Sequence, residues 1–344
     1  MSGSGRRREI GLALAGAAAA AAGVGLALTR ARRRHLRPPE DGSARSELEL
    51  PPGTRHLDIP VRDGGSVHVA EWGSGPPIVL LHGATLSSEV WAYQFRDLGA
   101  GRRLIALDLR GHGQSEPGEE GVTIGAMADD LADVLEALDL RRATVVGHSM
   151  GGMTALRFCR RHPEVLSARV GAIAIVASAG GIQPPLAGWE RLAPRVAGLI
   201  VAGHGAVNQA GWPIMPGNGA AARGARLVFG LAPDPLALRK TVQLSRAMRP
   251  DRFVSLLPEL VSFDERAAFE SLPVPTVVVV GDRDRLTPPR YARALVSTLP
   301  GAELVIWPGA GHMLMYERRE ALDWLLERLS QEAVAGKGAG LPPE

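Results

Sequence analysis

Polar residues that could form a nucleophilic site follow three of the short apolar runs in this chain. They are Ser149, an acid at Asp282 or Asp284, and His312. A serine hydroxyl becomes a strong nucleophile when a histidine takes its proton, and a carboxylate can hold that histidine in the required tautomer. Serine, acid and histidine in this chain order form one of the known triad arrangements. The pattern therefore predicts covalent catalysis by Ser149, with His312 as its base.

The local sequence around the serine has the form that such a nucleophile requires. Ser149 lies in Gly-His-Ser-Met-Gly-Gly at 147–152, between a strand-like run and a helical stretch, which is the Gly-x-Ser-x-Gly pattern in its expected setting. In a turn this tight, we expect side chains at Gly147 and Gly151 to collide with neighbouring backbone. The helix that follows would direct its first N–H groups, above all that of Met150, at an oxyanion. A role for Ser149 as a helix N-cap explains neither the glycines nor the partner residues.

A second backbone donor for the oxyanion is expected in another loop. The solid apolar run 78–81 is followed by His-Gly-Ala at 82–84. The backbone N–H of Ala84 is the best candidate there, and it would complete an oxyanion hole together with the N–H of Met150.

These residues need a scaffold that brings strand ends together. Strand-like runs occur at 55–59, 66–71, 78–81, 104–107, 144–146, 172–176, 277–280 and 304–306. Helical spacing of apolar residues appears at 124–138 and 322–329. Two strands joined by a hairpin signal, followed by strand–helix alternation, indicate a mostly parallel sheet with both faces covered. Chemistry in such sheets collects in the loops after the strands, where the candidate residues lie.

With these motifs in place, the chain resembles an α/β-hydrolase-fold enzyme over about residues 55–330. Asp-Leu-Arg-Gly-His-Gly-Gln-Ser at 108–115 is similar to the family's D-x-R-G-x-G-x-S loop. Gly-Asp-Arg-Asp at 281–284 is similar to its acid loop, and this likeness selects Asp284 over Asp282, which would then be an exposed turn residue. Epoxide hydrolases and haloalkane dehalogenases of this fold carry aspartate at the elbow, so Ser149 argues against both chemistries.

The resemblance also implies how the chain is divided. It places an eight-stranded, mostly parallel sheet in two core segments, 55–178 and 273–334, with a helical cap inserted at 179–272 and a loose tail at 335–344. Within the cap, 227–238 and 241–248 have helical character. Its large apolar residues form either the cap's own core or an apolar pocket facing Ser149. They are Phe229, Phe253, Phe263, Phe269, Trp189, Trp212, Met215 and Met248.

The N-terminal segment differs from the rest of the chain in charge and hydropathy. Residues 1–37 hold eight arginines and one acid, a charge of +7, which leaves −4 on the remainder because the whole chain carries +3. Residues 10–29 are uncharged and, as a helix, would be about 30 Å long, enough to cross a bilayer. We expect a single-pass membrane anchor, a linker at 38–54, and a slight preference for a cytoplasmic domain. A cleaved signal peptide and a disordered or surface-bound Ala-rich helix are the alternatives.

Composition narrows the remaining function classes. The acidic body argues against a nucleic-acid-binding protein. The single cysteine, Cys159, excludes an intramolecular disulfide, and the histidines show no metal-ligand spacing, so we expect no metal and no cofactor. The prediction is a serine hydrolase of small hydrophobic or lipid-like esters. The same triad also serves C–C hydrolases, lactonases, acyltransferases and cofactor-free peroxidases, and a non-catalytic binding protein is the alternative of another class. The oligomeric state stays open.

Overall fold

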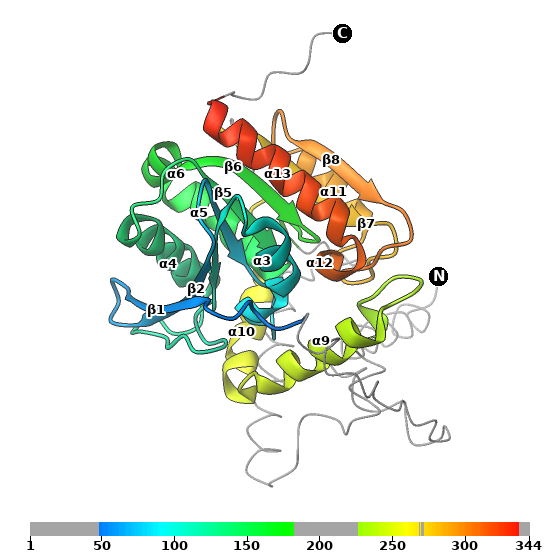
Figure 1. The fold of residues 1–344 in the computed structure, drawn as a ribbon, viewed down its shortest axis with the longest axis horizontal. Helices are drawn as coiled ribbons and strands as arrows, with labels where there is room; N and C mark the ends of the chain where they lie inside the picture. The colour runs from blue at the N-terminus through cyan, green and yellow to red at the C-terminus, as the bar shows by residue number, and fades with distance from the viewer. Residues whose placement is uncertain (1–47, 182–225, 268, 270–271, 337–344) are drawn as a thin grey trace, which may run out of the picture.

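An eight-stranded sheet forms the centre of the computed structural model, which describes residues 48–181, 226–267, 269 and 272–336 (Figure 1). The strands are β1 (Arg55–Pro60), β2 (Ser66–Trp72), β3 (Pro77–Leu81), β4 (Arg103–Leu107), β5 (Ala143–His148), β6 (Val170–Val176), β7 (Thr276–Gly281) and β8 (Glu303–Trp307). Their spatial order is β1-β2-β4-β3-β5-β6-β7-β8, and only β2 pairs antiparallel with its neighbours. The predicted mostly parallel sheet, with all eight strands, is confirmed.

Helices cover both faces of this sheet. One layer contains α4 (Ile124–Ala137), α5 (Met150–Arg161), α6 (Pro163–Arg169) and α11 (Pro289–Val296). The other contains the 3-10 helix η1 (Ser88–Trp91), α3 (Ala92–Leu98), α12 (Leu314–Glu317) and α13 (Arg319–Ala335). Side chains alternate along the central strands, so that Val79 and Leu81 of β3 pack in the first layer and Ile78 and Leu80 in the second. Because both faces are buried, the central strands consist mainly of apolar residues, as the sequence predicted.

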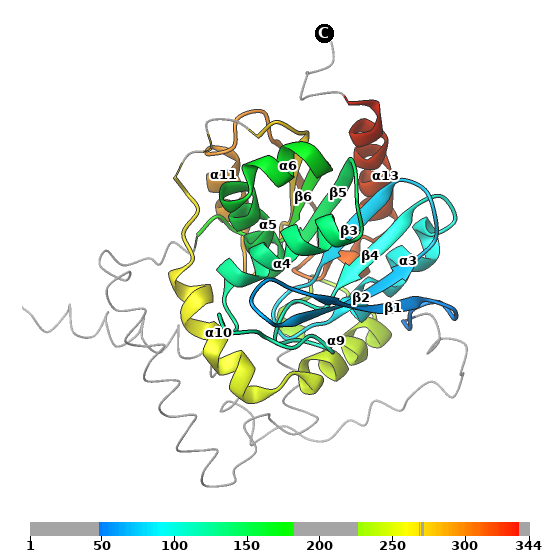
Figure 2. The ribbon, with the colours of Figure 1, turned by 90° about the vertical axis from the view of Figure 1, so that its left-hand side faces the viewer.

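The chain between β6 and β7 adds α9 (Pro235–Ala247) and α10 (Pro250–Ser262) (Figures 1 and 2). The helix expected at 227–238 is wrong in its first half, since residues 228–234 are not helical and α9 begins at Pro235. The reason is local: the Asp234 carboxylate accepts hydrogen bonds from the first free N–H groups of α9, and proline occupies the first helical position. The helical character expected at 241–248 is confirmed within α9.

Several phenylalanines of this region pack against the core of the protein. Phe263 and Phe269 belong to the main core cluster and lie against Arg157 and Arg160 of α5, at 5.4 and 4.6 Å from guanidinium to ring. Phe229 is buried and stacks on Tyr316. A structural role therefore accounts for these three. Trp189, Trp212 and Met215 lie outside the described residues.

Two predictions concern the ends of the chain, which lie outside the described residues. The expected membrane span at 10–29 lies outside the described residues, as does most of the predicted tail, 337–344. Within residues 48–181, 226–267, 269 and 272–336, none of the helices combines the length and apolar character that crossing a bilayer needs. Leu48, in the predicted linker, is buried in the core.

Asp97 of α3 and Asp323 of α13 form a carboxyl pair that makes the free energy of unfolding depend on pH. Burial, and then a hydrogen bond with Asp97, raise the pKa of Asp323 from its ordinary 3.8 to about 7. The unfolded chain loses this proton near pH 4 but the folded chain keeps it to about pH 7, so the free energy of unfolding falls as pH rises between these values. In Asp323→Asn, the carboxamide can donate to Asp97 and still accept from Gln94, whose Nε2 lies 3.0 Å from Asp323 Oδ1. We expect this variant to be more stable than wild type by about 1–3 kcal/mol at pH 8 and little changed at pH 4. The melting temperatures of wild type and variant at both pH values measure this difference. An equal change in melting temperature at the two pH values would contradict the prediction.

Candidate active site

The elbow between β5 and α5 holds Ser149 in a strained conformation. Its φ of 53° and ψ of −115° lie where non-glycine residues are rare. A Cβ built at Gly147 would collide with the Gly151 carbonyl, and one at Gly151 would collide with that of Leu81. The expectation that both positions require glycine is confirmed. Ser149 N–H donates to Val176 O at 2.9 Å, which fixes the turn against β6 and leaves the side chain partly exposed.

The acid and histidine loops bring Asp284 and His312 together. His312 Nδ1 lies 2.8 Å from Asp284 Oδ2. Thr287 Oγ1 donates to the same oxygen at 2.8 Å, and the N–H groups of Leu286 and Thr287 donate to Oδ1 at 2.8 and 2.9 Å. Burial acts to raise the pKa of Asp284, but His312 and the hydrogen bonds outweigh it, and the pKa is lowered. The carboxylate thus stays ionised and accepts a hydrogen bond from the protonated Nδ1, which leaves Nε2 able to accept a proton.

The neighbouring acid has another role. Asp282 Oδ1 accepts the Gly309 N–H at 2.6 Å, and the Asp282 side chain is more than one-third exposed. It supports the loop after β8, and in the structure it is Asp284 rather than Asp282 that pairs with His312.

His148 connects the elbow to the histidine loop. Its ring centroid lies 4.8 Å from that of His312, and its Nε2 lies 3.0 Å from the His312 carbonyl oxygen. Burial and then the nearby His312 lower the pKa of His148 to about 3, so the ring is neutral and Nε2–H is the donor. The Ser149 hydroxyl makes no hydrogen bond to His312 or to other groups in the described part of the chain. Such contacts often tighten only when substrate binds.

Two backbone N–H groups near Ser149 are candidates for an oxyanion hole. Neither Ala84 N–H nor Met150 N–H donates a hydrogen bond to another of the described residues. The loop that carries Ala84 passes close to the serine, because a Cβ at Gly83 would lie 3.1 Å from Ser149 Cβ. Met150 is the first residue of α5. Free amides at these two places could stabilise an oxyanion.

His82 fixes the peptide that carries the Ala84 N–H. Its Nε2 accepts the Leu109 N–H at 2.9 Å, so the proton is on Nδ1, which donates to Gly83 O at 2.8 Å. Burial lowers the pKa of His82 to about 4 and keeps the ring neutral. The Gly83 carbonyl and the Ala84 N–H belong to one peptide group, so holding the first orients the second. The sequence indicated only that His82 would be buried near the site, and its position before the glycine was the available signal.

The loop at 108–115 holds the His82 side chain in place through the Leu109 N–H. Asp108 accepts the N–H groups of Ser88 and Gln114 at 2.7 and 2.9 Å. Arg110 is buried and forms ion pairs with Asp63 and Asp130 at 2.6 and 2.5 Å. These bonds fix the loop that carries Leu109, and the Leu109 N–H in turn fixes His82.

Two other histidines, His68 and His162, are paired with carboxylates away from Ser149. His68 Nδ1 lies 2.8 Å from Asp58, and His162 Nε2 lies 2.6 Å from Asp129. Cys159 is buried, and burial raises the pKa of its thiol. No group of three or more His, Cys, Asp and Glu that could hold a metal ion occurs among the residues that the structure describes.

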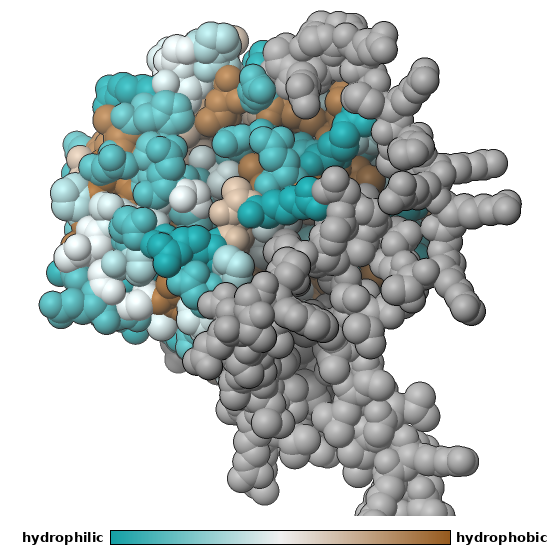
Figure 3. Space-filling view, turned by 90° about the horizontal axis from the view of Figure 1, so that it is seen from below, coloured by the Kyte–Doolittle hydropathy of each residue, from teal (hydrophilic) through white to brown (hydrophobic). Residues whose placement is uncertain are grey.

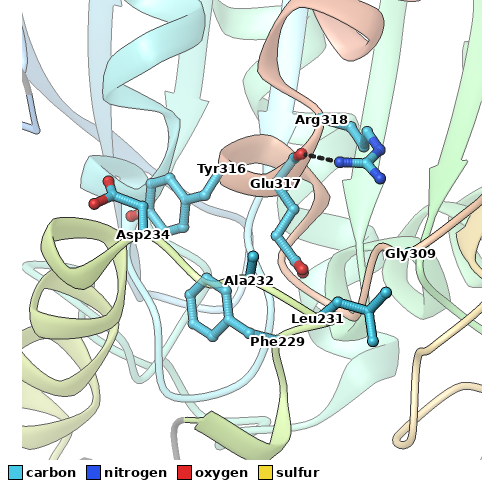
Figure 4. A pocket seen from close by; sticks show the side chains of 8 residues that line it. All are labelled: Phe229, Leu231, Ala232, Asp234, Gly309, Tyr316, Glu317 and Arg318. Atoms are coloured by element: carbon cyan, nitrogen blue, oxygen red, sulfur yellow. Dashed lines mark hydrogen bonds between the residues drawn. The ribbon is translucent and has the colours of Figure 1, made fainter.

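A pocket of about 240 Å³ lies next to the histidine loop (Figure 4). It is lined by Phe229, Leu231, Ala232, Asp234, Gly309, Tyr316, Glu317 and Arg318. It thus forms between the chain leading into α9 and the chain from β8 to α13, and its lining does not include the triad residues.

Comparison with known proteins agrees with this geometry. The sequence pattern of the alpha/beta hydrolase fold matches residues 76–319. The chain belongs to the α/β hydrolase fold family. The non-heme chloroperoxidase CPO-A1 of Kitasatospora aureofaciens is similar to this α/β hydrolase, with 30% identity over 73% of this chain and 90% of the relative. The AB hydrolase superfamily protein YisY of Bacillus subtilis is 28% identical over 77% of this chain and 95% of its own length.

Solved structures share the same fold. The esterase EaEST of Exiguobacterium antarcticum has a TM-score of 0.67 and 21% identity, and covers 80% of this α/β hydrolase with its entire length. Est816, described as an N-acyl homoserine lactone degrading enzyme, has a TM-score of 0.63 and 26% identity, covering 79% of this chain and 99% of its own. At 21% identity, the first likeness concerns the fold alone.

Proposed function

We propose that this α/β hydrolase is a serine hydrolase that cleaves carboxylic esters through an acyl-enzyme on Ser149. The observation that carries the proposal is the ionised, buried Asp284 paired with His312 Nδ1 at 2.8 Å, beside an elbow that exposes Ser149. A purely structural histidine would not need an oriented carboxylate of this kind together with two free amides.

The geometry suggests the following steps. Ser149 Oγ attacks the ester carbonyl carbon while His312 Nε2 takes the hydroxyl proton. The N–H groups of Ala84 and Met150 stabilise the tetrahedral oxyanion, each by about 3 kcal/mol. His312 then gives its proton to the leaving alcohol, which leaves the acyl group on Ser149. Water attacks next, His312 again takes and returns a proton, and the carboxylic acid departs.

Apolar surface near the loops that carry the triad supports hydrophobic esters as substrates. Leu286, two residues after Asp284, is 51% exposed, and Leu231, which bonds to the histidine loop at Gly309, is 66% exposed. Figure 3 shows apolar residues interrupting a largely polar surface on the side where α9 and α10 lie. The solved structures that share this fold include esterases, which supports ester substrates in general.

An ester series tests this proposal directly. The full chain, in mild detergent, is assayed with p-nitrophenyl esters from two to sixteen acyl carbons. We expect measurable hydrolysis with a maximum at medium or long chains. Equal rates on acetyl and long-chain esters would exclude the hydrophobic specificity, and no hydrolysis of any ester would contradict the proposed reaction.

A peroxide-dependent reaction is a second candidate, favoured by the chloroperoxidase relative at 30% identity. Hydrogen peroxide would replace water in attacking the acyl-enzyme, so that a peracid leaves instead of an acid. Peracid formation from acetate and hydrogen peroxide would be compared with ester hydrolysis on the same preparation. Both activities should disappear together in Ser149→Ala.

We also propose that residues 10–29 anchor the protein in a membrane, with the catalytic domain on the cytoplasmic side. The uncharged run and its flanking arginines support this placement. The full chain should sediment with membranes and resist extraction by alkaline carbonate, and protease added to the outside of intact cells should not cut the domain. Recovery in the soluble fraction would contradict the anchor.

A further inference from the structure

The carboxylate of Glu317, at the end of α12, collects backbone N–H groups from two separate segments. It accepts the N–H of Gly311 at 3.0 and 3.1 Å and that of Met313 at 3.1 Å. It also accepts the N–H of Gly230, from the chain between β6 and β7, at 2.6 Å. Figure 4 shows this side chain extended toward the segment that carries Phe229 and Leu231. Hydrogen bonds to an ionised carboxylate are about twice as strong as those between neutral groups.

These contacts enclose His312 on both sides. Gly311 and Met313 are its chain neighbours, and its own N–H donates to Val228 O at 2.7 Å. Leu231 N–H donates to Gly309 O at 3.1 Å, so that the segment 228–231 runs beside the histidine loop. The segment 228–231 packs closely on the histidine loop, because a Cβ at Gly311 would collide with the backbone of residues 228–230.

Glu317 adds a backbone restraint to the other contacts of the histidine loop. Asp284 holds the ring through Nδ1, and His148 holds the carbonyl oxygen. Val228 O holds the N–H of His312 itself, and Glu317 holds the N–H groups of its two chain neighbours. Glycine at 311 gives the backbone there more rotational freedom than any other residue would. Without the carboxylate, the N–H groups of Gly311 and Met313 would lose this acceptor, and the backbone that places the imidazole would be held less firmly.

We propose that Glu317 is a positioning residue that sets the place of His312 relative to Ser149 and couples it to the segment 228–231. The proposal rests on the proposed function, because it assigns His312 as the base. Glu317 acts through the backbone and does not touch the substrate. A shift of the imidazole by about 1 Å can cost a factor on the order of 100 in rate. Displacing the segment that leads into α9 would therefore also displace the base.

The experiment compares full-length Glu317→Ala and Glu317→Gln with wild type and with Glu320→Ala. Glu320 is exposed and follows in the next helix, so it is a matched control. In Glu317→Ala we expect kcat to fall roughly 10- to 100-fold with KM within about threefold, and the fluorophosphonate reaction at Ser149 to slow similarly. Glu317→Gln keeps one acceptor oxygen but turns an NH₂ toward a backbone donor, so its loss should be intermediate. Glu320→Ala should match wild type.

Proton NMR gives a readout that does not depend on turnover. The Nδ1 proton shared by His312 and Asp284 should resonate far downfield in wild type, and should weaken or shift in Glu317→Ala at an unchanged fold. If Glu317→Ala does not fold, the nearly isosteric Glu317→Gln tests the inference through the same kcat, labelling rate and Nδ1 resonance. Wild-type kcat, labelling rate and Nδ1 resonance in the folded variants would overturn the inference. Wild type that fails to hydrolyse esters or to react with the probe would instead count against the proposed function, and the Nδ1 resonance would still judge the role of Glu317.

Discussion

Replacing Ser149 with alanine is expected to lower kcat for ester hydrolysis by about 10⁴- to 10⁶-fold. The acyl-enzyme cannot form without the hydroxyl, and the remaining rate would come from the oxyanion hole and substrate binding alone. Folding should be preserved, because the partly exposed side chain makes no hydrogen bond in the described part of the chain. Initial rates on the preferred p-nitrophenyl ester, together with the melting temperature, measure both expectations.

A matched serine elsewhere controls for the substitution itself. Ser255 lies on the exposed side of α10 and bonds only to Arg252 O among the described residues. Ser255→Ala should retain wild-type kcat. If Ser149→Ala kept more than about one-hundredth of the wild-type rate, Ser149 could not be the nucleophile.

Replacing Asp284 with asparagine should have the next largest effect, a loss in kcat on the order of 10⁴-fold. The carboxamide can present its NH₂ to His312 Nδ1 and so favour the tautomer with the proton on Nε2, which cannot accept from Ser149. It would also leave the imidazolium without its counter-charge. KM should change little, because Asp284 is buried and lies behind the histidine.

Asp282→Asn is the matched control for this variant, two residues away in the same loop. Asp282 bonds to Gly309 N–H and not to His312, and a carboxamide oxygen can replace it there. We expect kcat within about threefold of wild type. A larger loss in Asp282→Asn than in Asp284→Asn would reverse the assignment of the acid.

Much of the scaffold could be predicted because its signals are local. The buried parallel strands are short apolar runs, and the first two strands are indicated by the turn residues between them at 62–65. The elbow glycines, the acid loop and the histidine loop each occupy a few consecutive residues, so their sequence and their place after a strand indicate their role.

What could not be predicted depends on contacts between distant segments. The start of α9 depends on whether Asp234 and Pro235 end a helix or begin one, and propensity alone favoured a longer helix. The roles of His82, His148 and Glu317 consist of hydrogen bonds to backbone groups, and the sequence does not show which backbone groups these are. Glu317 bonds to Gly230, 87 residues away, and only the folded chain brings them together.

The most direct test of the central claim is to identify the residue that reacts with a fluorophosphonate probe. Intact mass and peptide mapping of the full chain would locate the adduct. We predict one adduct on Ser149, absent in Ser149→Ala and formed much more slowly in Asp284→Asn. Folded wild-type protein that gives no adduct, or an adduct that persists in Ser149→Ala, would contradict the assignment of Ser149 as the nucleophile.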